Sequence, residues 1–162
     1  MGESALVAAW QHADPKIARD AKAFWKRLGV LPPAISLDQR ASELCAAAYL
    51  DGELVGVSTV SIGDLSSLPG CRFGFFRCLV APEHRRAHLA TSLTVFSRDV
   101  LSTWSKQHPE EGVLGMAAII ESPYLAELSR IPVWPASGLR LIGYTNNGQQ
   151  IRVVWFEHAR LE

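Results

Sequence analysis

Two tight-turn signals constrain the fold of this chain more than any other feature of its sequence. Asp51-Gly52 separates the apolar residues 44–50 from residues 53–62, and Asn147-Gly148 separates residues 139–145 from residues 150–156. A two-residue turn of this composition favours a β-hairpin, because both central residues adopt positive φ angles there. The sequence therefore predicts two antiparallel strand pairs, one of them near the C-terminus.

A short apolar run and an amphipathic helix come before the first hairpin. Residues 5–10 suit a strand, and Asp14 and Pro15 then suit the N-cap and first position of a helix. Gly29 is placed to end that helix. Apolar residues recur at helical spacing between these caps, at Ile17, Ala21, Phe24 and Leu28.

The middle of the chain predicts two buried strands with a long helix between them. Residues 71–80 are apolar on both faces, as in the interior of a sheet, and follow a polar loop over residues 63–70. A helix is expected from Arg85 onward, and residues 113–120 predict the second buried strand. The helix carries one apolar stripe, formed by Leu89, Leu93, Phe96, Val100 and Trp104.

Two shorter helices complete the predicted elements. A helical turn is expected over residues 37–42, and a short helix that Pro132 stops is expected over residues 122–131. Because a chain of 162 residues suits one compact domain, we expect a single domain over residues 1–162.

Charge and cysteine content exclude several classes of protein. Sixteen basic residues balance sixteen acidic ones, so no overall positive field favours nucleic acid. The cysteines Cys45, Cys71 and Cys78 lack the spacing of a zinc site or a disulfide framework. No apolar run approaches the length of a membrane span, and no targeting signal opens the chain. We expect a cytoplasmic protein with buried thiols, no metal and no membrane partner.

The stretch from residue 78 to residue 90 carries the clearest functional signal. It joins a buried strand to a long helix through a short turn containing Arg85 and Arg86. The free amides and positive dipole end of a helix N-terminus attract anions, and the two arginines add charge. Phosphate is the expected ligand. A solvated basic turn before an ordinary surface helix is the alternative.

These residues resemble the acetyl-CoA signature of the GNAT superfamily of N-acetyltransferases, V-x-P-x-x-R/Q-x-x-G-x-G/A. Val80, Pro82, Arg85 and Ala90 fall in register with it. The segment Gly138-Leu139-Arg140-Leu141-Ile142-Gly143 also resembles the G-F-x-x-x-G opening of the penultimate strand in that family. The resemblance covers nearly the whole chain. It implies an α/β (α+β) fold with a mixed, mostly antiparallel sheet of about seven strands flanked by about four helices.

The resemblance also implies a cofactor and a reaction. Acetyl-CoA would be the co-substrate, with its pantetheine arm on the backbone of Leu79 and Val80 and its phosphates at the turn. An acceptor amine would attack the thioester directly, with much of the acceleration coming from positioning. The cofactor-binding residues implied are Leu79, Val80, Arg85, Arg86, Ala87, His88, Leu89 and Ala90.

His88 departs from the family pattern, which has glycine at this position. A side chain here can crowd the pyrophosphate, although histidine is among the residues that adopt left-handed backbone angles more readily. Its ring can also donate a hydrogen bond to a phosphate oxygen. We expect the turn to accommodate His88 with its ring pointing away from the cofactor.

The acid and the base of the reaction are harder to assign. The family's usual tyrosine acid would fall at Trp134, so Tyr124 is the candidate acid and Ser129 a weaker one. Residues 73–80 contain no carboxylate, which leaves Glu121 as the candidate base, acting through a water. Packing by Tyr124, and a solvated or helix-capping Glu121, are the structural alternatives.

The acceptor itself is not encoded in any clear motif. Phe75 and Trp134 are the candidate substrate-binding residues, beside a loop that contains Pro32 and Pro33. These residues are apolar, which hints at an uncharged or weakly polar acceptor, although buried aromatic residues more often belong to the core.

Three functions compete at this stage. The first is an acetyl-CoA-dependent N-acetyltransferase, and the second is a catalytically silent acyl-CoA-binding or regulatory module, which His88 and the missing tyrosine favour. The third, a nucleotide- or nucleic-acid-binding module, is disfavoured by neutral charge and by the absence of a phosphate-binding glycine motif. A homodimer is compatible with the sequence, which contains nothing that decides the oligomeric state.

Overall fold

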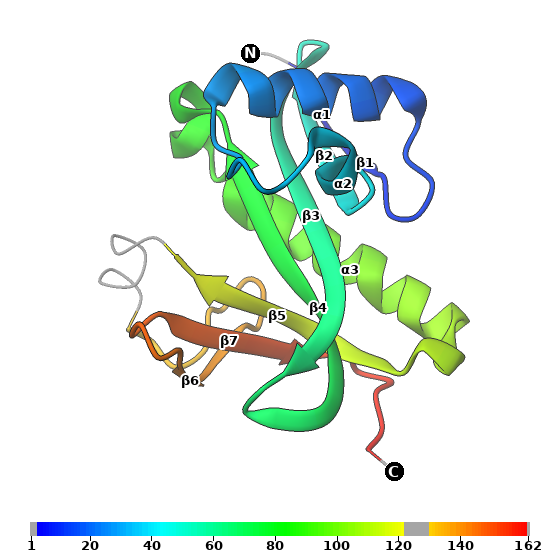
Figure 1. Ribbon diagram of the computed structural model, residues 1–162, viewed down its shortest axis with the longest axis vertical. Helices are drawn as coiled ribbons and strands as arrows, with labels where there is room; N and C mark the ends of the chain where they lie inside the picture. Colours follow the sequence, from blue (N-terminus) through cyan, green and yellow to red (C-terminus); the bar gives the residue numbers. More distant parts are fainter. Residues whose placement is uncertain (1–2, 122–129, 162) are drawn as a thin grey trace. The chain divides into compact units, whose positions relative to one another are not determined.

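Seven strands form one mixed sheet in the computed structural model, which describes residues 3–121 and 130–161 (Figure 1). Their order in the sheet is β1-β2-β3-β4-β5-β7-β6. The β4–β5 pair is parallel, whereas β1–β2, β2–β3, β5–β7 and β6–β7 are antiparallel. The strands are β1 Ser4–Ala8, β2 Leu44–Leu50, β3 Glu53–Leu65, β4 Leu68–Val80, β5 Val113–Ile120, β6 Arg140–Tyr144 and β7 Gln150–Trp155.

Helical segments occupy the connections between these strands. The α-helices among the described residues are α1 Pro15–Leu28, α2 Leu37–Ala41 and α3 Leu89–Gln107, and the 3-10 helices are η1 Pro82–Ala87 and η2 Pro109–Glu111. The mixed seven-stranded sheet confirms the fold class expected from the sequence. Most of the helix expected over residues 122–131, including Tyr124 and Ser129, lies outside the described residues.

The chain divides into two compact units. One comprises Met1–Val60 and Arg77–Val100, and the other comprises Ser61–Phe76 and Leu101–Glu162. The long strands β3 and β4 and the helix α3 contribute to both units.

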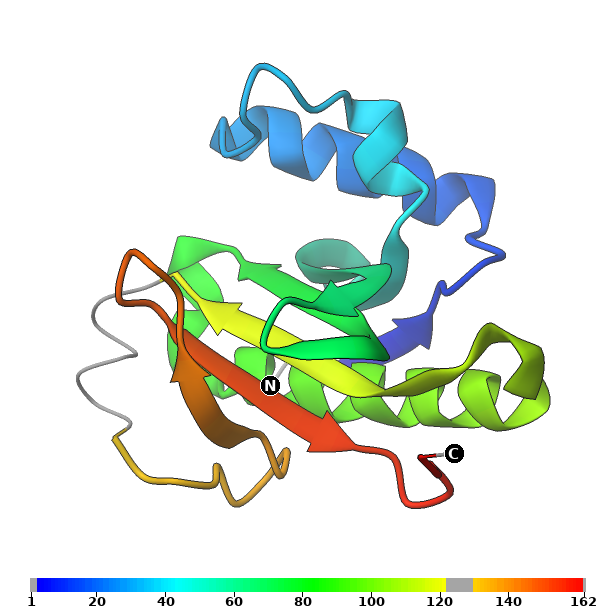
Figure 2. The ribbon, with the colours of Figure 1, turned by 60° about the horizontal axis from the view of Figure 1, so that its bottom comes forward.

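Strands of the first unit are covered on both faces. One face carries α1 and α2, which lie side by side (Figures 1 and 2), and the other carries the first half of α3. The α1/α2 cluster buries Ala9, Ile17, Ala21, Phe24, Trp25, Leu44, Ala47, Leu54, Val57 and Ala81, with Leu37, Ala41 and Leu79 packed against it. The α3 cluster buries Ala46, Ala48, Val55, Val80 and Leu93, with Leu89 and Phe96 packed against it.

The caps of α1 are those that the sequence predicts. The Asp14 carboxylate accepts a hydrogen bond of 2.8 Å from the Lys16 amide, and Pro15 occupies the first helical position. Gly29 ends the helix in the left-handed conformation, at φ 62°, where a side chain would be strained.

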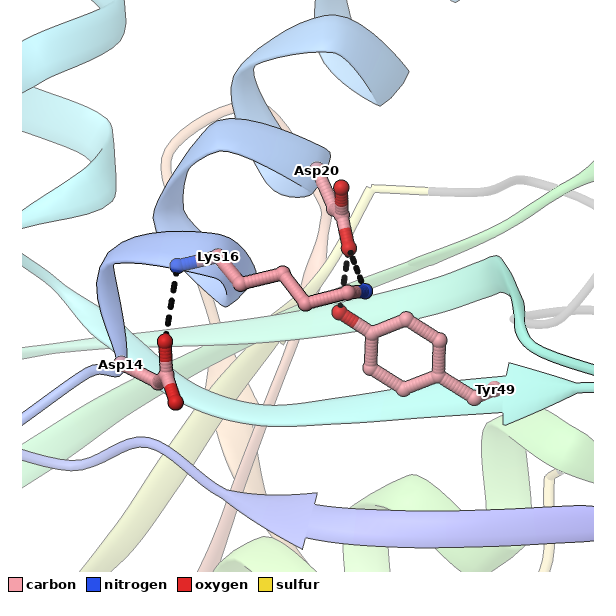
Figure 3. Close-up of polar contacts among 4 residues, drawn as sticks. All are labelled: Asp14, Lys16, Asp20 and Tyr49. Carbon is pink, nitrogen blue, oxygen red and sulfur yellow. Dashed lines mark hydrogen bonds and ion pairs between the residues drawn. The ribbon is translucent and has the colours of Figure 1, made fainter.

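A polar cluster attaches α1 to β2 (Figure 3). The Asp20 carboxylate accepts hydrogen bonds from Lys16 Nζ at 2.7 Å and from the Tyr49 hydroxyl at 2.8 Å. Lys16 Nζ also lies 4.9 Å from the centre of the Tyr49 ring. The hydrogen bond from Lys16 is the main cause that lowers the pKa of Asp20 below its ordinary value, against a smaller opposing effect of burial.

Two buried serines help to hold α3 in place, although the sequence predicts contacts only through an apolar stripe. The fully or nearly fully buried residues of this helix include Leu93, Ser97, Leu101 and Ser105, spaced four apart, whereas Leu89, Phe96, Val100 and Trp104 are half-buried. Ser97 Oγ lies 2.7 Å from Ser58 Oγ, and Ser105 Oγ donates to the Val113 carbonyl at 2.6 Å. The predicted stripe is therefore displaced, because these hydroxyls find hydrogen-bond partners that make their burial tolerable.

Two predicted boundaries are wrong. The expected polar loop over residues 63–70 is mostly strand. Leu65 and Leu68 pack into the core of the second unit, so β3 extends to Leu65 and β4 begins at Leu68 after a short turn. The long helix begins at Leu89 rather than Arg85, because His88 adopts a positive φ angle that an α-helix cannot contain.

The core of the second unit lies on one face of β5 and β7. It buries Leu65, Phe73, Ala117, Ile151 and Val153. Gly115 on β5 faces Trp155 on β7, and a Cβ atom added to Gly115 would lie 2.2 Å from the Val154 carbonyl oxygen. Only glycine allows this approach of the two backbones.

Substitution of Gly115 by alanine should lower the free energy of unfolding by at least about 2 kcal/mol, because backbone rather than a flexible side chain must move. The measurement is urea denaturation. Gly143→Ala on β6 is the matched control, since a Cβ atom there meets no atom within 4 Å. Equal stability of the two variants would contradict the close approach.

Tyr49→Phe should destabilise the protein by about 1 kcal/mol at neutral pH, because the Asp20 carboxylate loses a donor. Asp20 has a lowered pKa in the folded state, so this stabilisation is present above its unfolded pKa and is lost as pH falls through the folded value. Denaturation curves at pH 7 and pH 3 measure both effects. Tyr144→Phe, at an exposed tyrosine, should change neither.

Candidate functional site

The candidate site is the turn that leads from β4 to α3 in the first unit. The Ala81 amide donates to the Val55 carbonyl at 2.8 Å, and the His84 amide donates to the Ala81 carbonyl at 2.9 Å. Pro82 begins the 3-10 helix η1, which its ring favours because the first position needs no amide donor. The start of the turn is thus fixed to β3.

Arg85 is bound to the end of β4. Its Nε donates a hydrogen bond of 3.3 Å to the Val80 carbonyl, and the residue is exposed. Because a guanidinium carries five N–H groups, this contact orients the head group while its terminal nitrogens remain available for a ligand.

His88 separates η1 from α3. Its backbone angles are φ 57° and ψ 22°, in the left-handed region, and its side chain is exposed. The His88 carbonyl accepts from the Ser92 amide at 3.1 Å, which opens the hydrogen-bond series of α3. The amides of Leu89, Ala90 and Thr91 belong to the first turn, which an α-helix leaves without intrahelical acceptors. Backbone donors and the positive dipole end of α3 therefore begin directly after His88, in the same turn as Arg85.

Leu79 and Val80 end the strand that enters the turn. Their side chains point to opposite faces, Leu79 toward the α1/α2 cluster and Val80 toward the α3 cluster. Gly56 on β3 lets the helix come close, because a Cβ atom there would meet Leu93 Cδ1 at 3.0 Å and the Leu79 carbonyl at 3.4 Å. The first unit therefore contains one strand-turn-helix segment, which includes Leu79, Val80, Arg85, His88, Leu89 and Ala90. Arg86 and Ala87 lie in η1, within the same turn.

The second unit places the two predicted acceptor residues on opposite faces. Phe75 packs into the core beside Ile151 and Val153. Trp134 lies against Arg152, whose guanidinium carbon is 4.4 Å from the centre of its ring. Because Arg152 stands between Ile151 and Val153 on β7, its side chain points to the other face. These two aromatic residues do not form a shared pocket within this unit.

Arg152 is a buried residue that the sequence analysis missed. Its Nε donates to Gln150 Oε1 at 2.9 Å, and its terminal nitrogens donate to the carbonyls of Ile131 and Leu139 at 2.9 and 3.2 Å. It thereby holds the segment before β6 in place. An arginine in an otherwise apolar strand gives no sequence signal for these contacts.

The candidate base, Glu121, follows the end of β5 and is exposed. It has no hydrogen bond or ion pair with the part of the chain that the structure describes. The candidate acid, Tyr124, and the weaker candidate, Ser129, lie outside that part.

Thiols and metal ligands are not gathered into a site among the described residues. Cys45 is buried and Cys71 and Cys78 are half-buried, all three as free thiols. Burial raises the pKa of Cys45 to about 12 and that of Cys78 to about 11, so both are protonated at neutral pH. Across residues 3–121 and 130–161, no three His, Cys, Asp or Glu side chains are grouped as metal ligands would be.

Membrane-spanning helices are also missing from the described residues, where none combines the necessary length and apolar character.

Known structures share this architecture at low sequence identity. No protein-family model and no curated protein sequence matches the chain. A GNAT-family acetyltransferase from Streptococcus pneumoniae is 13% identical, with a TM-score of 0.57 over 93% of this chain and 96% of that one. The GNAT domain of S. lividans PAT is 14% identical, with a TM-score of 0.60 over 95% of this chain and 90% of that one.

A third similar structure contains a bound ligand. It is an aminoglycoside 6'-N-acetyltransferase complexed with coenzyme A, 11% identical, with a TM-score of 0.58 over 98% of this chain and 99% of that one. The chain thus has the fold of the GNAT acetyltransferases, and the resemblance drawn from the sequence is confirmed at the level of fold.

His88→Gly should raise the free energy of unfolding by about 0.5–1 kcal/mol, because glycine removes the left-handed strain but also makes the unfolded chain more flexible. Thermal denaturation measures the change. His88→Ala is the matched variant, which removes the ring and keeps the strain, so it should not be stabilising. A loss of stability in the glycine variant would show that the His88 side chain makes a stabilising contact.

Proposed function

We propose that this protein is an acetyl-CoA-dependent N-acetyltransferase that transfers the acetyl group to an acceptor amine. The observation that carries the proposal is the left-handed His88 turn, which starts α3 at Leu89 in the same turn that holds Arg85 against the Val80 carbonyl. That geometry suits the phosphates of CoA, and the GNAT fold supports the same ligand. The proposal treats residues 1–162 as one acyltransferase domain.

The turn and the strand would bind different parts of acetyl-CoA. The α3 amides and the terminal nitrogens of Arg85 would hold the pyrophosphate, with Arg86 adding charge. The backbone of Leu79 and Val80 would hold the pantetheine arm. His88 is exposed and needs no phosphate contact in this arrangement.

The reaction needs few side chains. The lone pair of the acceptor nitrogen would attack the thioester carbonyl carbon, the C–S bond would break, and CoA would leave as a thiol after protonation. Most amines are protonated at neutral pH, so a base must remove a proton before attack. Glu121, exposed after β5, stays the proposed base, and Tyr124 stays the proposed acid.

The three free thiols support a reducing, cytoplasmic location for this activity. A silent acyl-CoA-binding module is the second candidate, because Trp134 occupies the position of the usual tyrosine acid. Binding of acetyl-CoA without turnover on any amine would distinguish that module from the enzyme.

Calorimetric titration with CoA tests the binding site. Arg85→Ala should weaken CoA binding by about 10-fold or more, since a charge-assisted contact to phosphate is lost. Arg19→Ala, which removes an exposed arginine on α1, is the matched control and should leave CoA affinity unchanged. His88→Gly should change the affinity by less than about fivefold.

The outcomes are distinct. No heat and no thermal shift with near-millimolar acetyl-CoA would refute both the enzyme and the silent module. Equal effects of Arg85→Ala and Arg19→Ala would refute the assignment of the turn as the phosphate site.

A further inference from the structure

Arg40 on α2 is a buried arginine whose side chain forms no hydrogen bond with the described residues. It is 7% exposed, and its Nε atom is sealed from solvent without a partner. Its charged neighbour is Glu43, with 3.8 Å between Arg40 Nη1 and Glu43 Oε1. That distance is too long for a hydrogen bond. The Nε atom of Arg40 is therefore desolvated without the hydrogen bond that normally compensates.

Arg152, which is also buried in the part of the chain that the structure describes, shows what a structural role requires. Arg152 is fully buried, and its guanidinium donates to a side-chain amide and to backbone carbonyls. Arg40 has no equivalent set of acceptors. Among the three side-chain nitrogens of Arg40, Nε is the one that is inaccessible to solvent and has no hydrogen-bond partner. The two terminal nitrogens form no hydrogen bond with the described residues either, so they keep some contact with solvent. They remain available to an external acceptor.

Arg40 belongs to the same unit as Leu79 of β4, whose backbone is proposed to hold the pantetheine arm. Its helix neighbours Leu37 and Ala41 pack against the α1/α2 cluster, and so does Leu79 of β4. The Glu43 carbonyl accepts from the Val60 amide at 2.8 Å, which fixes the end of α2 to β3.

Thr59 on β3 is a second buried polar residue of this unit. Val57 belongs to the α1/α2 cluster and Ser58 contacts Ser97 of α3, so Thr59 points toward the α1/α2 face by strand alternation. Thr59 is 5% exposed and pairs with Leu44, which lies four residues after Arg40. Thr59 and Arg40 are thus both buried within the first unit, with Thr59 on the sheet face that the α1/α2 cluster covers.

Nearby carboxylates leave the Arg40 charge only partly compensated. Asp38, the other charged residue of α2, is paired with Lys22 of α1, a contact that lowers the pKa of that carboxyl. Glu43 is the one carboxylate with an ion pair to Arg40 in the described residues, and it does not reach hydrogen-bond distance.

We propose that Arg40 binds the carboxylate of the acceptor, so that the substrate of this protein is an amine that also carries a carboxylate group. This inference rests on the proposed acetyl transfer and narrows its acceptor class. The two terminal nitrogens of a guanidinium match the two oxygens of a carboxylate. The acceptor is then charged, in contrast to the uncharged or weakly polar acceptor that the apolar residues of the sequence suggest.

Acceptor binding tests this assignment without requiring turnover. Calorimetry with the CoA-saturated protein compares the twenty common L-amino acids, and a set of dipeptides, with their C-terminally amidated forms. At least one free acid should bind about 10-fold or more tightly than its amide, and Arg40→Lys should abolish most of that preference. Acetylation assays should show the same ratio in KM. Arg19→Met is the control and should keep the preference.

Stability measurements separate binding from a structural role. Arg40→Met should leave the melting temperature unchanged or raise it, because an apolar side chain replaces a desolvated charge without hydrogen bonds. Arg152→Met is the contrasting variant and should lower the melting temperature, because it leaves buried acceptors unpaired.

Each result has one meaning. Failure to bind CoA would refute the proposed function, and the same titrations on the unliganded protein would then decide the carboxylate site alone. CoA binding with equal affinity for acids and amides, or a lower melting temperature in Arg40→Met, would overturn the assignment of Arg40.

Discussion

The left-handed backbone of His88 is the constraint on which the candidate site depends. It ends η1, begins α3, and so decides which amides of the helix are left without partners. The hydrogen bond from Arg85 to the Val80 carbonyl reinforces the same turn from the side of β4. A right-handed residue at this position would allow the helix to continue backward into η1, and the amides of Leu89, Ala90 and Thr91 would then have intrahelical acceptors.

Local turn chemistry explains why much of the fold is predictable from the sequence. Asp51-Gly52 and Asn147-Gly148 place two hairpins, and Asp14, Pro15 and Gly29 delimit α1. The errors arise where distant packing prevails over local composition. Ser97 and Ser105 look polar but are buried through hydrogen bonds, and the polar residues around the short turn after Leu65 conceal a longer hairpin.

The candidate site divides in the same way. The turn from Val80 to Ala90 is visible in the sequence because the groups proposed to bind CoA there are backbone amides and side chains of consecutive residues. Arg40 and Arg152 are invisible there, because their roles depend on which distant groups surround a guanidinium. Phe75 and Trp134 are both apolar aromatic residues, and the sequence does not distinguish their positions. Phe75 packs with Ile151 and Val153, whereas Trp134 contacts Arg152, which points to the opposite face of β7.

The contact between Ser58 and Ser97 also determines the longitudinal position of α3. Apolar contacts are not directional, whereas two hydroxyls form a hydrogen bond only within a narrow range of distances, and those of Ser58 and Ser97 are 2.7 Å apart. Two turns separate Ser97 from Leu89, the first residue of the helix. The buried serine pair therefore fixes the position of α3 along β3, and with it the position of the first amides of the helix.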